Sequence, residues 1–215
     1  MDVLIDEIDV IVDGFQVTIQ LLVLSALLAT AIGTGLAAMR VAPVRVMRAI
    51  GTSYVNVFRN TPLIVLFILT FFGLPEVGIH LSFFREAVLA LTLYTSAFVC
   101  EAVRSGINAV DSGQAEAARA VGMTFGQTLG IIVLPQAFRA VVPPMASVYI
   151  ALAKNTSIAA GFGVAEAVFE MRGLLNDNPA DAYWLFFGVA VGYVLLVAVI
   201  STASHLLERR WAAAR

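Results

Sequence analysis

The chain has 215 residues, of which 60% are hydrophobic and 13% are charged, and its mean hydropathy is +0.91. Soluble domains are about 45–50% apolar and about 25% charged, and a chain of this length cannot bury so much apolar surface in one soluble core. The composition therefore excludes a soluble globular protein and predicts an integral membrane protein. The formal net charge of −2 indicates no particular partner.

The first 13 residues are acidic as well as apolar. They carry five Asp or Glu side chains and no Lys or Arg, whereas a signal peptide begins with a positively charged region. We therefore expect a short interfacial helix or a simple tether here.

Uncharged segments mark the membrane spans. The segments 14–39 and 182–207 contain no Asp, Glu, Lys or Arg, and about 20 apolar residues suffice to cross the hydrocarbon core. The uncharged runs between them are shorter. The predicted spans lie near 15–39, 52–74, 86–105, 128–153 and 183–207. The expected fold class is thus an all-α, polytopic membrane protein with about five transmembrane helices, and residues 1–215 form a single membrane domain.

Arginine is concentrated on one side of this predicted membrane. It follows the first, third and fifth spans, at Arg40, Arg45, Arg48, Arg104, Arg119, Arg209, Arg210 and Arg215. The connections on the other side, 76–86 and 166–181, are acidic and contain one arginine each. Because cytoplasmic loops are enriched in Lys and Arg, we expect the N-terminus outside and the C-terminus in the cytoplasm.

A short helix near 111–126 interrupts the apolar pattern between the third and fourth spans. Asp111 is a suitable N-cap, and the Gln114 side chain can return a bond to the backbone of the cap. Glu116 and Arg119 are spaced to form an ion pair on one face of the helix. The segment is too short and too polar to span. It either inserts into the groove of a partner protein or lies on the lipid headgroups.

Two further features describe this segment. Ala118, Val121 and Phe125 form an apolar stripe at helical spacing, and Gly122 and Gly126 are expected to end the helix. Four prolines lie near the ends or inside the predicted spans and are expected to break helices, which would leave backbone groups to line a cavity. They are Pro62, Pro135, Pro143 and Pro144.

Catalytic motifs are missing. The chain has no G-x-x-x-x-G-K-[ST] loop for phosphate, because its only lysine, Lys154, follows Ala153. His80 and His205 are far apart in the sequence, and no His/Cys cluster indicates a metal. We expect no catalytic residues, no metal site and no cofactor bound by this chain. Any transport against a gradient then needs an energy source on another subunit.

One motif resembles that of a known family. Glu116-Ala117-Ala118, Gly122 and the Ile132-x-Leu134-Pro135 segment have the spacing E-A-A-x3-G-x9-I-x-L-P. This resembles the EAA signature of the membrane-spanning subunits of bacterial ABC importers. The resemblance implies the type I importer fold, a location in the bacterial plasma membrane, and a coupling helix, with Phe125 on its apolar stripe, that sits in a cleft of a separate cytoplasmic ABC ATPase dimer. ATP and Mg would be bound by that partner.

Three other stretches are similar to the polar amino acid subgroup of the family. They are Gly14-x-x-x-Thr18, the sequence FRNTPL at 58–63 and the sequence KNTS at 154–157. Five spans with the N-terminus outside are also typical of that subgroup. The resemblance is nearest to permeases of actinobacterial glutamate importers, and it implies a non-catalytic pore subunit that moves glutamate or another acidic amino acid by alternating access.

Charged side chains at membrane depth are costly and usually face a cavity or a partner. The candidate lining of a substrate passage therefore consists of Arg59, Asn60, Thr61, Glu101, Arg139, Lys154, Asn155, Thr156 and Ser157. Simpler explanations exist: Arg59 could contact headgroups, Arg139 could form a structural bridge with Glu101, and Lys154 could extend to the interface.

Five helices are too few to enclose a gated passage, so a second permease subunit, identical or homologous, is expected. The acidic connections 76–86 and 160–181 could receive an extracytoplasmic solute-binding protein, or they could only join spans. The other partner is the lipid bilayer, and nothing indicates a nucleic acid. Two rival functions remain open at this point, a self-sufficient secondary transporter or channel, and a membrane scaffold that moves no solute.

Overall fold

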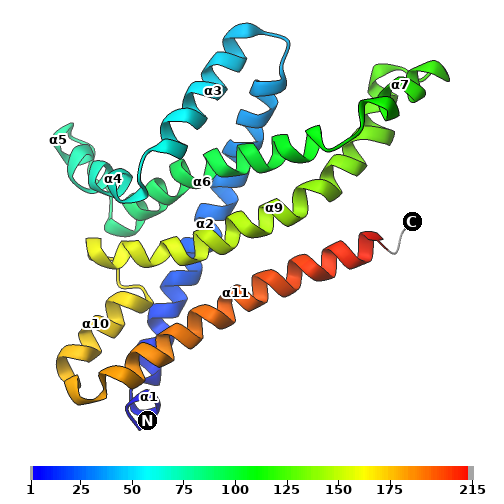
Figure 1. The fold of residues 1–215 in the computed structure, drawn as a ribbon. Helices are drawn as coiled ribbons and strands as arrows, with labels where there is room; N and C mark the ends of the chain where they lie inside the picture. The colour runs from blue at the N-terminus through cyan, green and yellow to red at the C-terminus, as the bar shows by residue number, and fades with distance from the viewer. Residues whose placement is uncertain (1, 213–215) are drawn as a thin grey trace.

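The computed structural model describes residues 2–212, and every regular element among them is helical (Figure 1). Arg215, which was counted among the basic residues after the fifth span, lies outside the described residues. The first half of the chain contains α1 (Asp2–Asp6), α2 (Ile8–Val41), α3 (Arg45–Asn60), α4 (Leu63–Ile68), the π-helical η1 (Leu69–Gly73), α5 (Leu74–Glu76) and α6 (Phe83–Asn108). The second half contains α7 (Ser112–Ala120), α8 (Phe125–Gln127), the π-helical η2 (Thr128–Val133), α9 (Leu134–Asn155), the 3-10 helix η3 (Thr156–Phe162), α10 (Ala167–Asp177), the 3-10 helix η4 (Pro179–Asp181) and α11 (Ala182–Ala212).

Four stretches of the described chain are long and apolar enough to cross a membrane: 8–41, 83–108, 125–162 and 179–210. They contain the predicted spans 15–39, 86–105, 128–153 and 183–207. A fifth span is reached only if α3 and α4 are counted as one broken span. The acidic N-terminal segment is helical and leads directly into α2.

The predicted span 52–74 is not a single helix, because α3 and the helix that follows it meet at an angle of 101°, and Pro62 breaks it as expected. Thr61, between them, has an extended backbone conformation (φ −89°, ψ 129°). The ring of the following Pro62 disfavours the helical conformation at Thr61, and Pro62 has no N–H to continue the helix. As a result α3 runs back along the end of α2, and α4 turns away from it (Figure 1).

The other prolines do not break helices as expected. Pro143 and Pro144 lie inside α9, which continues through both. Pro135 is the second residue of α9 and follows the π-helical η2 without a break, so that one helix, 125–162, runs through it. The backbone thus adapts around these prolines and stays helical.

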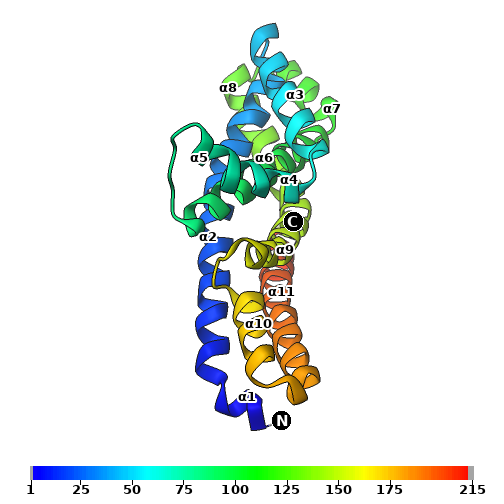
Figure 2. The same ribbon diagram turned by 90° about the vertical axis from the view of Figure 1, so that its left-hand side faces the viewer.

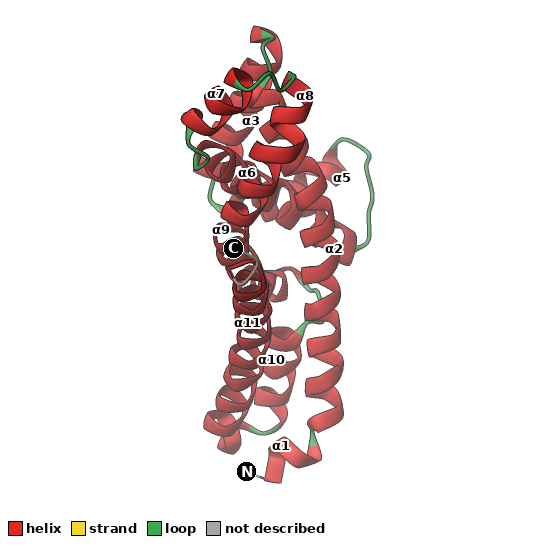
Figure 3. Cartoon of the chain, turned by 90° about the vertical axis from the view of Figure 1, so that its right-hand side faces the viewer, coloured by secondary structure: helices red, strands yellow, loops and turns green. Residues whose placement is uncertain are grey.

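Helix α6 is the centre of the bundle. It packs against α2, α3, α4 and α9, and its buried small residues, such as Ala87, Ala90 and Ala97, allow these neighbours to approach. A second cluster joins α1, α10 and α11 to the first part of α2, as the two side views show (Figures 2 and 3). Large apolar side chains on the outer faces of α2 and α11, including Leu27, Val194 and Leu195, are exposed, as expected for helices that face lipid or another subunit.

Candidate functional site

The interrupting helix α7 is shorter than the predicted segment 111–126. Asp111 is its N-cap, as expected, and its side chain accepts a hydrogen bond from the Gly113 amide at 2.7 Å. The helix ends at Ala120. The chain then turns through Gly122, whose φ of +86° belongs to the left-handed region that favours glycine. The turn at Gly122 thus terminates the helix, whereas Gly126 lies in the following helix, α8 (Phe125–Gln127).

Phe125 consequently belongs to the next element. Thr124 and Gln127 form a capping box that starts α8, with the Thr124 hydroxyl accepting from the Gln127 amide and the Gln127 side chain accepting from the Thr124 amide. The capping box predicted at Asp111 and Gln114 is not formed, since the Asp111 side chain bonds Gly113 instead. The predicted end of the helix at residue 126 was wrong, because Thr124 caps a separate helix, α8.

The expected pair of Glu116 and Arg119 is also absent from the described ion pairs, and the Arg119 Nε donates to the Ala115 carbonyl at 3.3 Å. The corner between α7 and α8 instead presents two large apolar side chains to its surroundings. Val121 is 80% exposed and Phe125 is 79% exposed. Ala118, the third member of the predicted stripe, is buried.

The remaining signature residues lie directly behind this corner. Ile132 is in η2, and Leu134 and Pro135 begin α9. Helix α7 packs against η2, so the two halves of the signature are in contact in space. Ala118 is the residue that α7 buries, and Thr128 is the residue that η2 buries.

A second site is a cluster of three arginines around Glu101 of α6. Its Oε1 accepts a hydrogen bond from Arg40 of α2 at 2.5 Å, and its Oε2 accepts two from Arg104, from Nη2 at 2.8 Å and from Nε at 3.2 Å. Arg59, at the end of α3, lies 3.8 Å from Oε1, which is an ion-pair distance without a hydrogen bond. One carboxylate thus joins three helices, and the cluster has two positive charges in excess.

Glu101 pairs with the three arginines of this cluster and does not form the bridge that was expected with Arg139. Arg139 is not among the partners of Glu101, because it lies on α9, where it lines a cavity described below. The Arg40–Glu101 pair was not predicted from the sequence, because Arg40 was expected to lie beyond the end of the first span. The length of α2, which extends to Val41, keeps Arg40 in the last helical turn and within reach of α6.

The other predicted passage residues fall into two places. Asn60 and Thr61 lie at the bend after α3, where their side chains bond the carbonyls of Asn56 and Val57. Lys154, Asn155, Thr156 and Ser157 lie where α9 passes into η3. Helix α4 connects the two places in space, because it follows the bend and packs against η3.

The hydroxyl groups at the second place are occupied within their own helix. Thr156 is fully buried, and its hydroxyl donates to the Ala153 carbonyl at 2.7 Å. The Ser157 hydroxyl donates to the Lys154 carbonyl at the same distance. Lys154 itself is exposed.

A buried network holds α10 to α2 and α11. Glu166, the N-cap of α10, is fully buried, and its Oε1 accepts from the amides of Val168 at 2.9 Å and Phe169 at 3.1 Å. Its Oε2 accepts from the Tyr193 hydroxyl at 2.7 Å and lies 3.3 Å from the Thr18 hydroxyl oxygen. Burial raises the pKa of the Glu166 carboxyl, and these hydrogen bonds oppose the shift.

This network explains why the Gly14-x-x-x-Thr18 spacing occurs in α2. The Thr18 hydroxyl accepts from the Ala167 amide at 3.2 Å. A Cβ at Gly14 would come within 2.9 Å of the Ala167 Cα, so only glycine lets α10 approach this closely. Glu166 was predicted only as part of an acidic connection, although its position before the segment 167–177 was the available signal for a helix cap.

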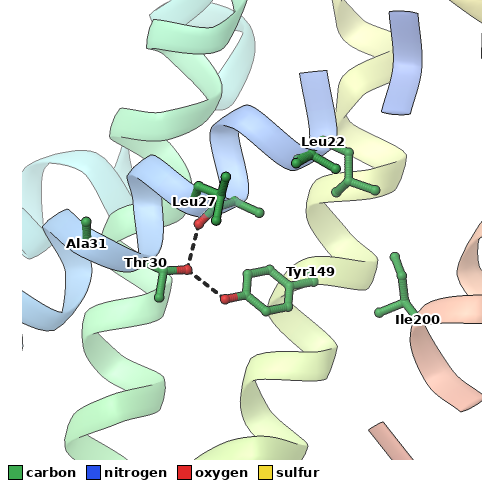
Figure 4. Close-up of a pocket in the computed structure, with 8 residues that line it drawn as sticks. Leu22, Leu27, Thr30, Ala31, Tyr149 and Ile200 are labelled. Atoms are coloured by element: carbon green, nitrogen blue, oxygen red, sulfur yellow. Dashed lines mark hydrogen bonds between the residues drawn. The ribbon is translucent and has the colours of Figure 1, made fainter. Parts of the chain in front are cut away.

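Two cavities lie along α2. The smaller, called here the α11 cavity, has a volume of about 570 Å³ and lies between α2, α9 and α11. The larger, the α6 cavity, has a volume of about 1070 Å³ and lies between α2, α6, η2 and α9. Their walls are mostly apolar. Thr30 and Tyr149 line both, and their hydroxyl oxygens are 2.6 Å apart (Figure 4).

Comparison with known protein families identifies the family of this chain. The family described as the binding-protein-dependent transport system inner membrane component matches residues 12–213. The chain belongs to this family. A glutamate transport system permease protein of Corynebacterium efficiens is 44% identical over 195 residues, which cover 85% of this chain and 86% of the relative. A glutamate/aspartate import permease protein of Escherichia coli is 37% identical over 210 residues, which cover 92% of this chain and 85% of the relative.

Solved structures agree with the sequence relatives. A crystal structure of an amino acid ABC transporter with histidines has a chain that is 28% identical, with a TM-score of 0.90 and coverage of 96% of both chains. The predicted resemblance to binding-protein-dependent permeases and the predicted type I importer fold are thereby confirmed. As an inner membrane component, the chain is a non-catalytic permease subunit of a bacterial ABC importer.

Proposed function

We propose that this permease subunit forms half of the passage through which a polar amino acid, and specifically glutamate or another acidic amino acid, enters the cell. The observation that carries the proposal is the exposed α7–α8 corner with its complete E-A-A signature, in a chain whose named relatives transport glutamate. The excess positive charge around Glu101, on the same bundle, favours an anionic solute.

The coupling role belongs to the corner. In the proposed arrangement α7 faces the cytoplasm and sits in a cleft of a separate ATPase, which binds ATP and Mg. Glu116, Ala117, Ala118, Gly122 and Phe125 make or shape the contact. Since α7 packs on η2, movement of α7 would pass through Ile132, Leu134 and Pro135 into α9. The N-terminus then lies outside, and the cavities open and close by alternating access.

A second permease subunit completes the passage, because the lone bundle leaves large apolar faces of α2 and α11 uncovered. On the outside, the acidic connections 76–86 and 160–181 are the proposed contact surface for a solute-binding protein. The permease pair thus connects a binding protein to an ATPase dimer.

The test is reconstitution of this permease with its neighbouring ATPase and binding protein in lipid vesicles. We expect uptake of glutamate or aspartate that stops when internal ATP is removed. Uptake that continues without any ATPase would support a secondary transporter. Recruitment of an ATPase without flux of any of the common amino acids would support a scaffold.

The corner itself can be tested with two glycines. Gly122→Ala and Gly126→Ala each add one Cβ into open space, but only Gly122 has a positive φ. We expect Gly122→Ala to cost about 1–2 kcal/mol of local strain and to reduce substrate-stimulated ATP hydrolysis severalfold. Gly126→Ala is the matched control and should leave the stimulation intact. Equal rates in the two variants would show that the geometry of the corner does not matter for coupling.

Glu116→Lys addresses the signature more directly. The side chain is exposed, so the substitution should not affect insertion or folding, yet it reverses a charge on the proposed docking face. We expect loss of ATPase stimulation by substrate while the permease still purifies with normal yield. Normal transport rates in this variant would contradict the assignment of α7 as the coupling helix.

Substitution of Arg59 tests whether the substrate is an acidic amino acid. The Arg59 guanidinium makes no hydrogen bond to Glu101, and it is therefore the member of the cluster most available to a solute carboxylate. We expect Arg59→Ala to raise the substrate concentration for half-maximal uptake by about tenfold, the effect of losing one charge-assisted hydrogen bond. Arg45→Ala, an exposed arginine at the start of the same helix, is the control. An unchanged concentration dependence would place Arg59 among residues that contact headgroups.

A further inference from the structure

The two cavities along α2 share one pair of lining side chains. The α11 cavity is lined on α2 by residues between Leu22 and Ala31, and the α6 cavity by residues between Thr30 and Val41. Thr30 and Tyr149 are the residues common to both. The cavities therefore follow one another along the length of α2, and the Thr30–Tyr149 contact belongs to the lining of both. Figure 4 shows this contact among the residues of the α11 cavity.

The hydrogen bonds at this contact have a direction. The Thr30 hydroxyl is 2.6 Å from the Ala26 carbonyl of its own helix, to which it donates. Its one hydrogen is then used, so the Tyr149 hydroxyl must donate to the Thr30 oxygen. Tyr149 is thus held across the space between α9 and α2 by one hydrogen bond, in walls that are otherwise almost entirely apolar.

We propose that the Thr30–Tyr149 hydrogen bond is the constriction of the passage, and that it opens when a solute carboxylate replaces Thr30 as the acceptor for the Tyr149 hydroxyl. The proposal rests on the import function proposed above. In apolar surroundings an unpaired Tyr149 hydroxyl is costly, so the contact stays closed until another acceptor arrives. A carboxylate is a stronger acceptor than a hydroxyl, which allows the exchange without an unpaired intermediate.

Neighbouring residues fit this path. Beyond the contact, Arg139 is the only charged side chain among the residues that line the α6 cavity. A carboxylate that leaves Tyr149 would find its next charged partner there. The α11 cavity has no charged residue in its lining, so the Tyr149 hydroxyl and then Arg139 are the partners that a carboxylate on this path would meet.

The experiment measures whether a water-soluble reagent passes the contact. The one cysteine, Cys100, is fully buried, and Cys100→Ala provides a cysteine-free background. Ala38→Cys then places a thiol in the α6 cavity, where Ala38 is exposed, and Ala31→Cys places one in the α11 cavity. Labelling by a charged, membrane-impermeant thiol reagent, added on the side of α1, is measured in the reconstituted importer without ATP.

In the parent protein we expect labelling of Ala38→Cys from this side to be slow, and labelling of Ala31→Cys to be faster. Tyr149→Phe removes the donor and keeps the ring, while Thr30→Val removes the acceptor and keeps the shape. Each should accelerate labelling of Ala38→Cys by about tenfold, as expected when the free energy of one hydrogen bond is lost. The two changes combined should add little, because both remove the same bond.

Tyr183→Phe, on the highly exposed tyrosine of α11, is the matched control and should change nothing. The idea is overturned if Tyr149→Phe and Thr30→Val leave the labelling rate unchanged, or if their effects simply add. ATP-driven uptake of glutamate by the parent protein is measured alongside. Normal uptake with unchanged labelling would reject the constriction and leave the import function standing, whereas absent uptake with accelerated labelling would reject the substrate and keep the constriction.

Discussion

Glu101→Ala is expected to lower the free energy of unfolding by about 3 kcal/mol and to abolish transport. The carboxylate is mostly buried, with 22% of its side chain exposed, and it is the shared partner of Arg40, Arg59 and Arg104. Its removal leaves three positive charges close together with no counter-charge, and it removes the ion pairs that join α2 and α3 to α6. The cost is larger than that of an exposed ion pair, for which the median is below about 1 kcal/mol.

The measurement is the thermal unfolding midpoint of the purified permease in detergent, together with uptake in vesicles. Glu76→Ala provides the control for the unfolding midpoint only, because Glu76 is exposed and makes none of the described ion pairs but lies in the connection proposed to contact the binding protein. A double-mutant cycle with Arg40→Ala should show that the second change costs much less once the first is present. If Glu101→Ala is no more harmful than Glu76→Ala, the cluster is not a structural connection.

Glu166→Ala is expected to cost about 3 kcal/mol, the combined effect of losing a helix cap and leaving buried donors without an acceptor. The amides of Val168 and Phe169 and the hydroxyl of Tyr193 all lose their partner. Glu166→Gln should cost less, since one amide oxygen can still cap α10 and the Tyr193 hydroxyl can turn to accept from the amide nitrogen.

Hydrogen exchange across 167–177 gives the local measurement. We expect the first turn of α10 to lose protection in Glu166→Ala and to keep most of it in Glu166→Gln. Asp177→Ala, an exposed acid at the other end of the same helix, is the control and should leave protection in the first turn unchanged. Unaltered exchange in Glu166→Ala would show that α10 is held by its apolar contacts alone.

The sequence predicted the long spans well and the broken one poorly, for a physical reason. An uncharged run of 26 residues such as 14–39 leaves a bilayer helix as the only structure that satisfies its backbone. The segment 52–74 contains Arg59 and a shorter uncharged run, and the Thr61–Pro62 step turns the chain by 101°. Apolar composition shows how much surface must avoid water, but it does not show where a helix bends or in which direction the next helix runs.

Local sequence also predicted the cap and the turn of the α7–α8 corner more accurately than it predicted which charged side chains meet. The cap at Asp111 and the turn at Gly122 depend on residues close in sequence, and both lie within the predicted segment. The passage residues were selected as charged or polar groups near membrane depth. The neutral hydroxyls among them bond their own helix, as at Thr61 and Thr156, whereas Glu101 pairs with Arg40, which is 61 residues away.

By itself, the sequence determined the class of protein, the long spans and the family signature, because each follows from composition or from spacing within one segment. Only the tertiary structure decided which charges meet, that Glu166 is a buried cap with partners on three helices, and that Thr30 and Tyr149 line both cavities. The physical reason is the same in each case. A hydrogen bond or ion pair depends on a few ångströms between side chains, and in a helical bundle helix length, bends and close approach at small residues set that distance.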